Sequence, residues 1–395
     1  MFARDLGLLF FGKVIVSCAV WMYSTAAALL LYAHTQSTTA IALGAAAQFG
    51  PQLILTPLSG ALADRCGAAP QIIVGRLISI AGAGVLAGWS GRFLGSASES
   101  EVVVAVSISA SLVGLGFVIG GPAMQAIVPR LVTSDELTTA SVLNTTPATV
   151  ARIAGPVAGA WLFATAGPMW TFGVIAVLHA AFVPMVILAR LPRKADVTHG
   201  HDGSVRAAVR VIAEHPVLSR CFIGLVAVGI GSEPVLTLAP ALAAHFGYGE
   251  SAAGTMNSAF GIGAAIALVV LAACAARLSS RWMSGAGTAM LVAGLLAAGL
   301  VSTLWACCVA IAVAGAGFSS ASAGFSAAVQ KISPAEFRGR IMALWITALV
   351  GTRPVAAGIA AVSADVVSAQ FGCITVAVVV AVMGMAAVRR RKRMT

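Results

Sequence analysis

The chain has 395 residues, of which 59% are hydrophobic and only 9% are charged, and its mean hydropathy is +0.97. Soluble domains carry about 25% charged residues, so this composition excludes a soluble enzyme. The net charge of +11 comes from 24 Lys and Arg against 13 Asp and Glu. In so apolar a chain we interpret this excess of positive charge first as a feature of membrane topology, and only then as a sign of nucleic-acid binding. Seven cysteines without a C-x-x-C pair indicate neither a disulfide framework nor a zinc site.

Apolar runs long enough to cross a membrane recur along the whole sequence. A spanning helix needs about 20 mostly apolar residues, and interruptions by polar residues, Pro and Gly predict twelve of them. Their limits are near 8–33, 39–62, 71–90, 102–124, 138–165, 168–189, 217–243, 251–274, 283–303, 304–329, 341–363 and 366–388. Their Ala- and Gly-rich texture is typical of closely packed membrane helices.

The cations predict the orientation of these spans. With both termini inside, nearly all Lys and Arg lie in cytoplasmic loops or at cytoplasmic span ends, and only Arg92 lies outside. The positive-inside rule therefore predicts a multi-pass protein of the cytoplasmic membrane with both termini in the cytoplasm. Most of the positive charge then faces the anionic lipids of the inner leaflet, and no nucleic-acid partner is expected.

The turn between the second and third spans reads Gly60-Ala-Leu62-Ala-Asp64-Arg65-Cys-Gly67. Glycines allow a tight turn, and Asp64 can meet a helix N-terminus or a cation of the other half. The motif resembles motif A of the major facilitator superfamily, G-x-L-x-D-R-x-G. The resemblance implies a conformational gate formed by Gly60, Leu62, Asp64, Arg65 and Gly67. The chain departs from the motif at residues 68 and 69, where alanines replace the usual basic residues.

The fifth span carries a second set of motif residues. The stretch from Pro122 to Gly159, together with "EHPVLSR" and "EFRGRIMAL" further on, resembles the enterobactin-exporter-like, drug-efflux branch of the same superfamily. Gly155-Pro156-x-x-Gly159 also resembles part of motif C, which is associated with antiporters. Alanines at 151 and 160 replace glycines of the fuller motif. The alternative is a simple kink, because Gly-Pro bends any membrane helix.

The longest polar stretch separates six spans from six. It predicts an N-terminal bundle over 1–190, a cytoplasmic linker with an amphipathic helix over 191–216, and a C-terminal bundle with a basic tail over 217–395. His199, His201 and Asp202 in the linker suggest a metal site, but without a fourth ligand a solvated linker is preferred. The halves echo each other: Glu136 and Glu336 are 200 residues apart, and Arg152 and Arg353 are 201 apart. This offset indicates duplication and two pseudo-symmetric bundles.

Three ionisable residues are predicted within spans, where charge is costly and marks function by default. Arg152 and Arg353 lie midway along the fifth and eleventh spans; they bind an anionic or phenolic substrate group or are structural ions. Glu233 in the seventh span is suited to carry a proton, since a carboxyl group out of water resists ionisation. The alternatives are that it reaches outer water or pairs permanently with an arginine. The arginine that many drug/proton antiporters carry in the fourth span is missing from "LVGLGFVIGGPAM".

Uncharged polar residues within the spans are Gln48, Gln125, Asn144 and Asn257. Each either lines the transport path or makes a hydrogen bond between helices. Tryptophans near the predicted span ends, Trp89 among them, are interpreted as interface anchors.

These features predict a secondary transporter that exports a small amphipathic molecule, such as a drug, siderophore or secondary metabolite, by proton antiport. We expect a monomer without cofactor or metal, and no ATP site, because the sequence has no G-x-x-x-x-G-K-[ST]. One alternative is an uptake symporter or facilitator of the same fold. A remote alternative is a polytopic enzyme acting on lipids, which would need clustered carboxylates or His/Asp motifs that the sequence lacks.

Overall fold

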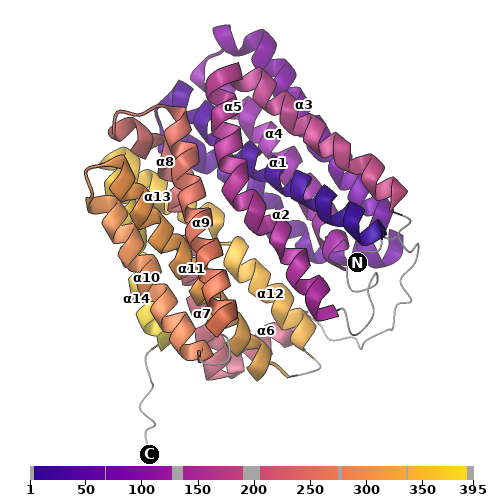
Figure 1. Ribbon diagram of the computed structural model, residues 1–395, viewed down its shortest axis with the longest axis vertical. Coiled ribbons are helices and arrows are strands. Elements are labelled where there is room, and N and C mark those ends of the chain that lie inside the picture. Colours follow the sequence, from indigo (N-terminus) through magenta and orange to yellow (C-terminus); the bar gives the residue numbers. More distant parts are fainter. Residues whose placement is uncertain are drawn as a thin grey trace, which may run out of the picture. The chain divides into compact units, whose positions relative to one another are not determined.

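The structure is a computed structural model that describes residues 4–66, 68–126, 137–189, 205–274, 278–334 and 337–388. Every regular element in these ranges is helical (Figure 1). The chain divides into two compact units, the first formed by Met1–His199 with Ala239–Ser258 and the second by Gly200–Leu238 with Ala259–Thr395. A short segment of the second half of the sequence therefore packs with the first half.

The helices of the first unit follow the predicted spans closely. They are α1 (Arg4–Thr35), α2 (Thr38–Cys66), α3 (Ala68–Phe93), the short 3-10 helix η1 (Leu94–Ser96), α4 (Glu99–Ala126) and α5 (Leu137–Leu188). Within α5, Gly167 has non-helical backbone angles with a φ of 80°, in the left-handed region that glycine enters without steric cost. The chain turns there, at the predicted boundary between the fifth and sixth spans.

The second half of the chain contains more breaks. Its helices are α6 (Val205–Glu214), α7 (Pro216–Gly231), α8 (Pro234–His245), α9 (Glu250–Cys274), α10 (Ser280–Leu300), α11 (Leu304–Ile332), α12 (Arg338–Val350), α13 (Arg353–Val366) and α14 (Ala369–Val388). The short α6 forms where the amphipathic helix is predicted, and its exposed Arg210 and Glu214 form an ion pair of 3.0 Å. The predicted seventh span is divided into α7 and α8, and the predicted eleventh into α12 and α13.

Ten helical stretches of the described residues are long and apolar enough to cross a membrane. One of them, Pro147–Leu188, is 42 residues long and contains the turn at Gly167, so it comprises two spans. Helix α2, with 29 residues, provides a further one. The predicted all-α architecture with twelve spans is therefore confirmed.

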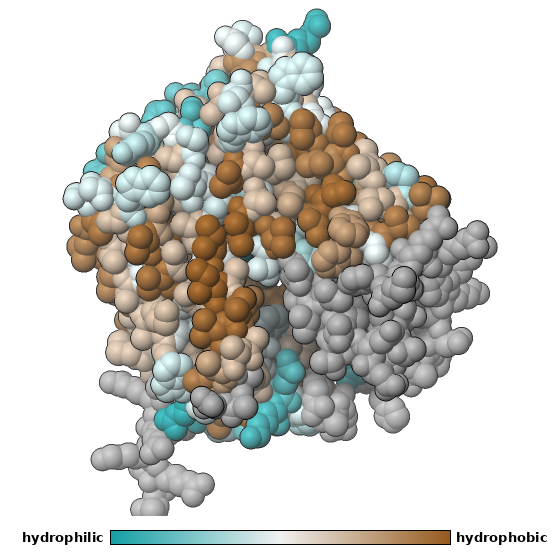
Figure 2. Space-filling model, viewed as in Figure 1, coloured by the Kyte–Doolittle hydropathy of each residue, from teal (hydrophilic) through white to brown (hydrophobic). Residues whose placement is uncertain are grey.

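Apolar side chains cover the flanks of the helices. Figure 2 shows hydrophobic residues exposed along these flanks and hydrophilic ones gathered near the ends. Val177 and Val269 are 65% and 70% exposed, far more than a water-soluble core helix allows. Such exposure costs nothing in lipid, where the surroundings are as apolar as the side chain.

Helices within each unit approach one another at glycines. A Cβ at Gly75 of α3 would overlap the Gly116 carbonyl oxygen of α4, and a Cβ at Gly114 would overlap the Gln48 carbonyl oxygen of α2. Lipid tails are as apolar as leucine, so helix association in a membrane relies on this close backbone packing.

The same glycine contacts recur in the second unit. Gly315 of α11 lies against the Phe260 carbonyl of α9 as Gly114 lies against Gln48, and Gly287 of α10 lies against the Gly317 carbonyl as Gly75 lies against Gly116. The α4 and α11 glycines are 201 residues apart in both cases. Their partners on the other helices are 212 residues apart in both cases. Two constant offsets show that one packing scheme is used twice, as expected of two pseudo-symmetric bundles.

Replacing a contact glycine should therefore destabilise the fold much more than replacing an exposed one. We expect Gly75→Val to lower the free energy of unfolding by about 1–3 kcal/mol, the usual cost of overpacking. Gly84→Val is the matched control on the same helix, because a Cβ at Gly84 meets nothing within 4 Å. Thermal unfolding in detergent measures both; equal loss in the two variants would mean that close packing at Gly75 does not hold α3 to α4.

Candidate transport site

The carboxylate predicted within the seventh span lies at a helix break. Helix α7 ends at Gly231, and Glu233 immediately precedes Pro234, the first residue of α8. Proline has no N–H to continue the helical hydrogen bonds, and the Ser232 hydroxyl donates back to the Gly229 carbonyl at 2.8 Å. Every residue from 227 to 243 is buried, and Glu233 is fully buried. The carboxyl group is thus held inside the bundle at an interruption of the helix.

The arginine predicted within the eleventh span lies at a second break. Helix α12 ends at Val350, and after Gly351 and Thr352 the chain resumes as α13 with Arg353 as its first residue. Arg353 Nε lies 3.5 Å from Glu233 Oε2, and both side chains are largely shielded, with exposed fractions of 12% and 1%. Two charges that are 120 residues apart in the sequence therefore form one ion pair.

The two broken helices also touch through their backbones. A Cβ at Gly229 would overlap the Leu349 carbonyl oxygen and would lie 2.6 Å from the Thr352 hydroxyl oxygen. The last turn of α7 is therefore seated directly on the end of α12. The ion pair and this seat bring both breaks to the same place in the second unit.

Helix dipoles act differently on the two charges. The N-terminus of α8 favours the Glu233 carboxylate that precedes it, because the helix N-terminus carries partial positive charge. The N-terminus of α13 disfavours the Arg353 guanidinium for the same reason. Arg353 therefore depends on Glu233 more than Glu233 depends on Arg353, and loss of the carboxylate charge would leave the guanidinium poorly compensated.

Arg152, the predicted counterpart of Arg353, has different surroundings. It lies within the uninterrupted first part of α5, and its guanidinium carbon is 5.0 Å from the centroid of the Trp21 ring of α1. This is cation–π geometry, which stabilises a guanidinium. The two arginines are equivalent in sequence but not in interaction.

The motif C-like segment packs on two sides. On one side a Cβ at Gly155 would meet Trp21 and the Cys18 carbonyl, and a Cβ at Gly159 would meet the backbone of Met22. These glycines seat α1 on α5. Gly155 and Gly159 therefore make helix-packing contacts, which the interpretation of a simple kink does not include.

The other side of the segment receives the first turns of α9. A Cβ at Gly254 would overlap the Ala160 side chain and would lie 2.7 Å from the Pro156 carbonyl oxygen. The Ser258 hydroxyl donates a hydrogen bond to the Ile153 carbonyl oxygen, in the turn where Pro156 weakens the hydrogen bonding of α5. This contact joins the first turns of α9 to the first unit, to which residues 239–258 belong.

Two of the predicted uncharged polar residues are engaged in hydrogen bonds. Gln48 of α2 is buried, and its side chain exchanges hydrogen bonds of 3.0 and 3.1 Å with the Ser24 hydroxyl of α1. Asn257 donates from Nδ2 to the Ala253 carbonyl one turn earlier in α9. Of the two alternatives for Gln48, the structure contains the hydrogen bond between helices.

Several predicted site residues fall on parts whose side chains the structure does not describe. Helix α2 includes the backbone of Gly60, Leu62, Asp64 and Arg65, and Gly67 lies outside the described residues. The same limit applies to the side chains of Gln125 and Asn144, and the linker residues His199, His201 and Asp202 lie outside the described residues. In the part of the chain that is described, no group of three or more His, Cys, Asp or Glu could hold a metal ion.

One buried contact between two ionisable side chains, Arg76 and His179, was not predicted from the sequence. Arg76 of α3 is 1% exposed, and its Nη1 lies 3.5 Å from Nδ1 of the fully buried His179 of α5. Its position near the cytoplasmic end of the predicted third span does not indicate this burial. No carboxylate of the described ranges lies within ion-pair distance of Arg76. His179 was detectable, because it is an ionisable residue in the middle of the predicted sixth span.

Two pseudo-symmetric helical bundles, with buried charges at interrupted spanning helices, are the architecture of membrane transporters of the major facilitator superfamily. Residues 5–394 match the family described as transmembrane secretion effectors, and the chain belongs to this family. The branch named for enterobactin exporters is not singled out by this match. A comparison with curated proteins found no match.

Solved structures of transporters share the fold. A variant of the nucleoside transporter NupG aligns with a TM-score of 0.77 at 13% identity, covering 98% of this chain and 99% of the other. A POT family transporter in complex with a thioalcohol-conjugated peptide aligns at 0.75 with 13% identity, covering 97% and 95%. A bacterial homologue of the iron transporter ferroportin aligns at 0.73 with 17% identity, covering 99% and 100%. Family and fold neighbours are thus transporters, as expected, and not enzymes.

Neutralising one member of the Glu233–Arg353 pair should cost more than neutralising both. We expect Glu233→Gln and Arg353→Gln each to lower the free energy of unfolding by about 3 kcal/mol, because each removes one partner of a largely shielded ion pair. The double variant should regain part of that loss. Thermal unfolding in detergent of the unchanged protein, the two single variants and the double variant measures this double-mutant cycle.

The exposed pair of α6 is the control for this cycle. Arg210→Gln and Glu214→Gln should change stability by less than about 0.5 kcal/mol, since exposed pairs contribute little. Strictly additive losses at Glu233 and Arg353 would mean that the two charges do not interact.

Proposed function

We propose that the chain is a monomeric secondary transporter of the cytoplasmic membrane, with both termini inside, that exports a small amphipathic molecule by proton antiport. The observation that carries this proposal is the buried ion pair between two interrupted helices, in a chain whose family is described as secretion effectors. The family description supports the outward direction. The pair supports coupling to protons, because Glu233 is a buried carboxylate and a proton that binds it can break its pairing with Arg353.

Coupling follows from competition for the Glu233 carboxylate. In this proposal the ionised form of Glu233 pairs with Arg353, whose Nε lies 3.5 Å from Glu233 Oε2. A proton that binds Glu233 removes the attraction and leaves Arg353 at the N-terminus of α13, where it is poorly compensated. The arrangement of α7 on α12 is then favoured less, so protonation shifts the balance between two conformations.

Export by antiport requires that substrate and proton exclude each other. A substrate with a cationic or hydrogen-bond-donating group satisfies this requirement by binding the ionised form of Glu233. Each proton that enters from outside displaces such a group, and each substrate molecule that binds from inside displaces the proton. The mostly apolar span surfaces suit the remainder of an amphipathic molecule.

Two gates complete the cycle in this proposal. With both termini inside, the contact of Gly254 with Pro156 and Ala160 lies in the outer half of the membrane and forms the outer gate. The turn at Asp64 and Arg65, by its likeness to motif A, forms the inner gate. Small residues make the outer contact close, and the hydrogen bond from Ser258 to the Ile153 carbonyl is one that can break and reform.

The alternative of uptake by symport has its own observation. Arg353 at the N-terminus of α13 is also suited to an anionic substrate group. An anion that binds Arg353 favours the protonated form of Glu233, so proton and substrate then bind together and travel in the same direction. The sign of the gradient that drives transport separates the two mechanisms.

Transport in inside-out vesicles tests the coupling. The probe is an amphipathic dye selected because expression of the chain lowers its growth inhibition in an efflux-deficient host. An acidic lumen should drive accumulation of the dye severalfold above equilibrium, and a protonophore should abolish it. Glu233→Gln should reduce accumulation to the equilibrium level, since the amide cannot exchange a proton.

Glu250→Gln is the control for this experiment, because Glu250 is an exposed carboxylate in the first turn of α9. It should accumulate the dye as the unchanged protein does. Gradient-driven accumulation that persists in Glu233→Gln would assign Glu233 to structure, and accumulation driven by an alkaline lumen would establish symport instead.

The outer gate is tested by access of a thiol reagent. In a cysteine-free background, Ser258→Cys places the reporter at the contact, and a membrane-impermeant maleimide is applied from outside. Adding Gly254→Val should increase the labelling rate at least about fivefold, because a side chain at 254 cannot fit against Ala160 and Pro156. Thr255→Val, at an exposed neighbouring position, should leave the rate unchanged; equal rates in both variants would refute the gate.

A further inference from the structure

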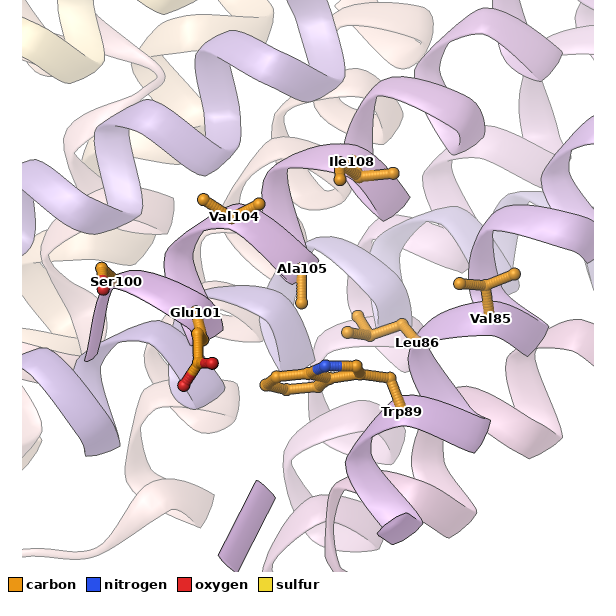
Figure 3. Close-up of a pocket in the computed structure, with 8 residues that line it drawn as sticks. All are labelled: Val85, Leu86, Trp89, Ser100, Glu101, Val104, Ala105 and Ile108. Atoms are coloured by element: carbon orange, nitrogen blue, oxygen red, sulfur yellow. The ribbon is translucent and has the colours of Figure 1, made fainter. Parts of the chain in front are cut away.

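A groove runs between α3 and α4 on the surface of the first unit, separate from the charged pair. It is lined by Val85, Leu86 and Trp89 of α3 and by Ser100, Glu101, Val104, Ala105 and Ile108 of α4 (Figure 3). Val85, Val104 and Ile108 are more than half exposed. Both helices are spanning stretches, so the apolar part of the groove opens toward the acyl chains of the membrane.

One end of the groove is polar and lies where the spans end. Glu101 is in the first turn of α4, and Trp89 is in the last turns of α3, close to η1. Figure 3 shows the Glu101 carboxylate projecting toward the carbon edge of the Trp89 indole, away from the indole nitrogen. A carboxylate beside an aromatic ring is the usual environment for an ammonium group.

The charges at this end have both signs. Glu99 and Glu101 supply negative charge in the first turn of α4. Arg92 lies three residues after Trp89 on α3 and is exposed, and residues three apart share a helix face. A zwitterionic headgroup matches this pattern, with its ammonium at Glu101 and its phosphate toward Arg92. An anionic headgroup without an ammonium would meet two carboxylates.

We propose that the groove is a binding site for one phosphatidylethanolamine molecule. Its primary ammonium donates hydrogen bonds to Glu101 and lies against the Trp89 ring. One acyl chain follows Ala105, Val104 and Ile108 along α4, over a length of about 10 Å between Glu101 and Ile108. A choline headgroup binds less well, because a quaternary ammonium has no N–H to donate.

The carboxylate can be neutralised without loss of the helix end. Glu101 Oε2 accepts hydrogen bonds from the Ser98 backbone N–H at 2.7 Å and from the Ser98 hydroxyl at 2.8 Å, and the Glu101 N–H is directed at that hydroxyl. Glutamine serves in such a capping box as glutamate does. Glu101→Gln therefore removes the charge and keeps the start of α4.

Native mass spectrometry of the purified full chain, titrated with lipids of equal acyl composition, tests the proposal. Phosphatidylethanolamine should bind more tightly than phosphatidylcholine and phosphatidylglycerol. Glu101→Gln should weaken its affinity about threefold to fivefold, the size expected for one exposed ion pair, and Trp89→Leu should weaken it further. Glu99→Gln, which alters a neighbouring charge outside the groove lining, should have a smaller effect.

A photoactivatable phosphatidylethanolamine locates the site independently of affinity. Cross-links should concentrate on peptides of residues 85–108 and decrease in Glu101→Gln. Equal binding of the three lipids, an affinity unchanged by Glu101→Gln, or cross-links spread evenly over all spans would each overturn the proposal, because the groove would then hold only bulk lipid.

Discussion

The fold depends on backbone-to-backbone contact between helices. In lipid these helices exclude no water when they associate, so there is no hydrophobic driving force between them. Apolar side chains cover surfaces in contact with lipid and with protein alike, so burial of apolar area does not determine which helices associate. Glycines do. Gly75, Gly114 and their counterparts Gly287 and Gly315 bring a carbonyl of the next helix to where a Cβ would stand. Each bundle is therefore specified by a few positions from which a side chain is absent.

The charged side chains, unlike the packing glycines, do not repeat between the two units. The packing glycines recur in both units, but the buried charges do not: Arg353 pairs with Glu233, whereas Arg152 lies over the Trp21 ring. Arg76 and His179 form a third arrangement, found in the first unit. Arg353, Arg152 and Arg76 thus contact a carboxylate, an aromatic ring and an imidazole, respectively. The halves thus share a packing scheme and differ in the polar groups that it encloses.

Much of this could be predicted from the sequence, because spans, linker helix and intramembrane charges all depend on local composition. The turn at Gly167 and helix α6 were expected within a few residues. Pairing of Glu233 with an arginine is one of the alternatives that the sequence leaves open. That this arginine is Arg353 could not be predicted, because the contact depends on how α7 meets α12. The burial of Arg76 could not be predicted either, because hydropathy reports depth along one helix and not the neighbours that cover it.

The packing of α5 on α1 and α9 has a consequence for how the protein can change in evolution. Gly155 and Gly159 hold α1 on one face, while the carbonyls near Pro156 receive α9 on the other. A substitution on the first face threatens the bundle itself. A substitution on the second disturbs the contact with α9 and leaves the packing of α1 in place. Residues 155 to 159 thus serve two separate contacts, and a substitution can alter one of them without the other.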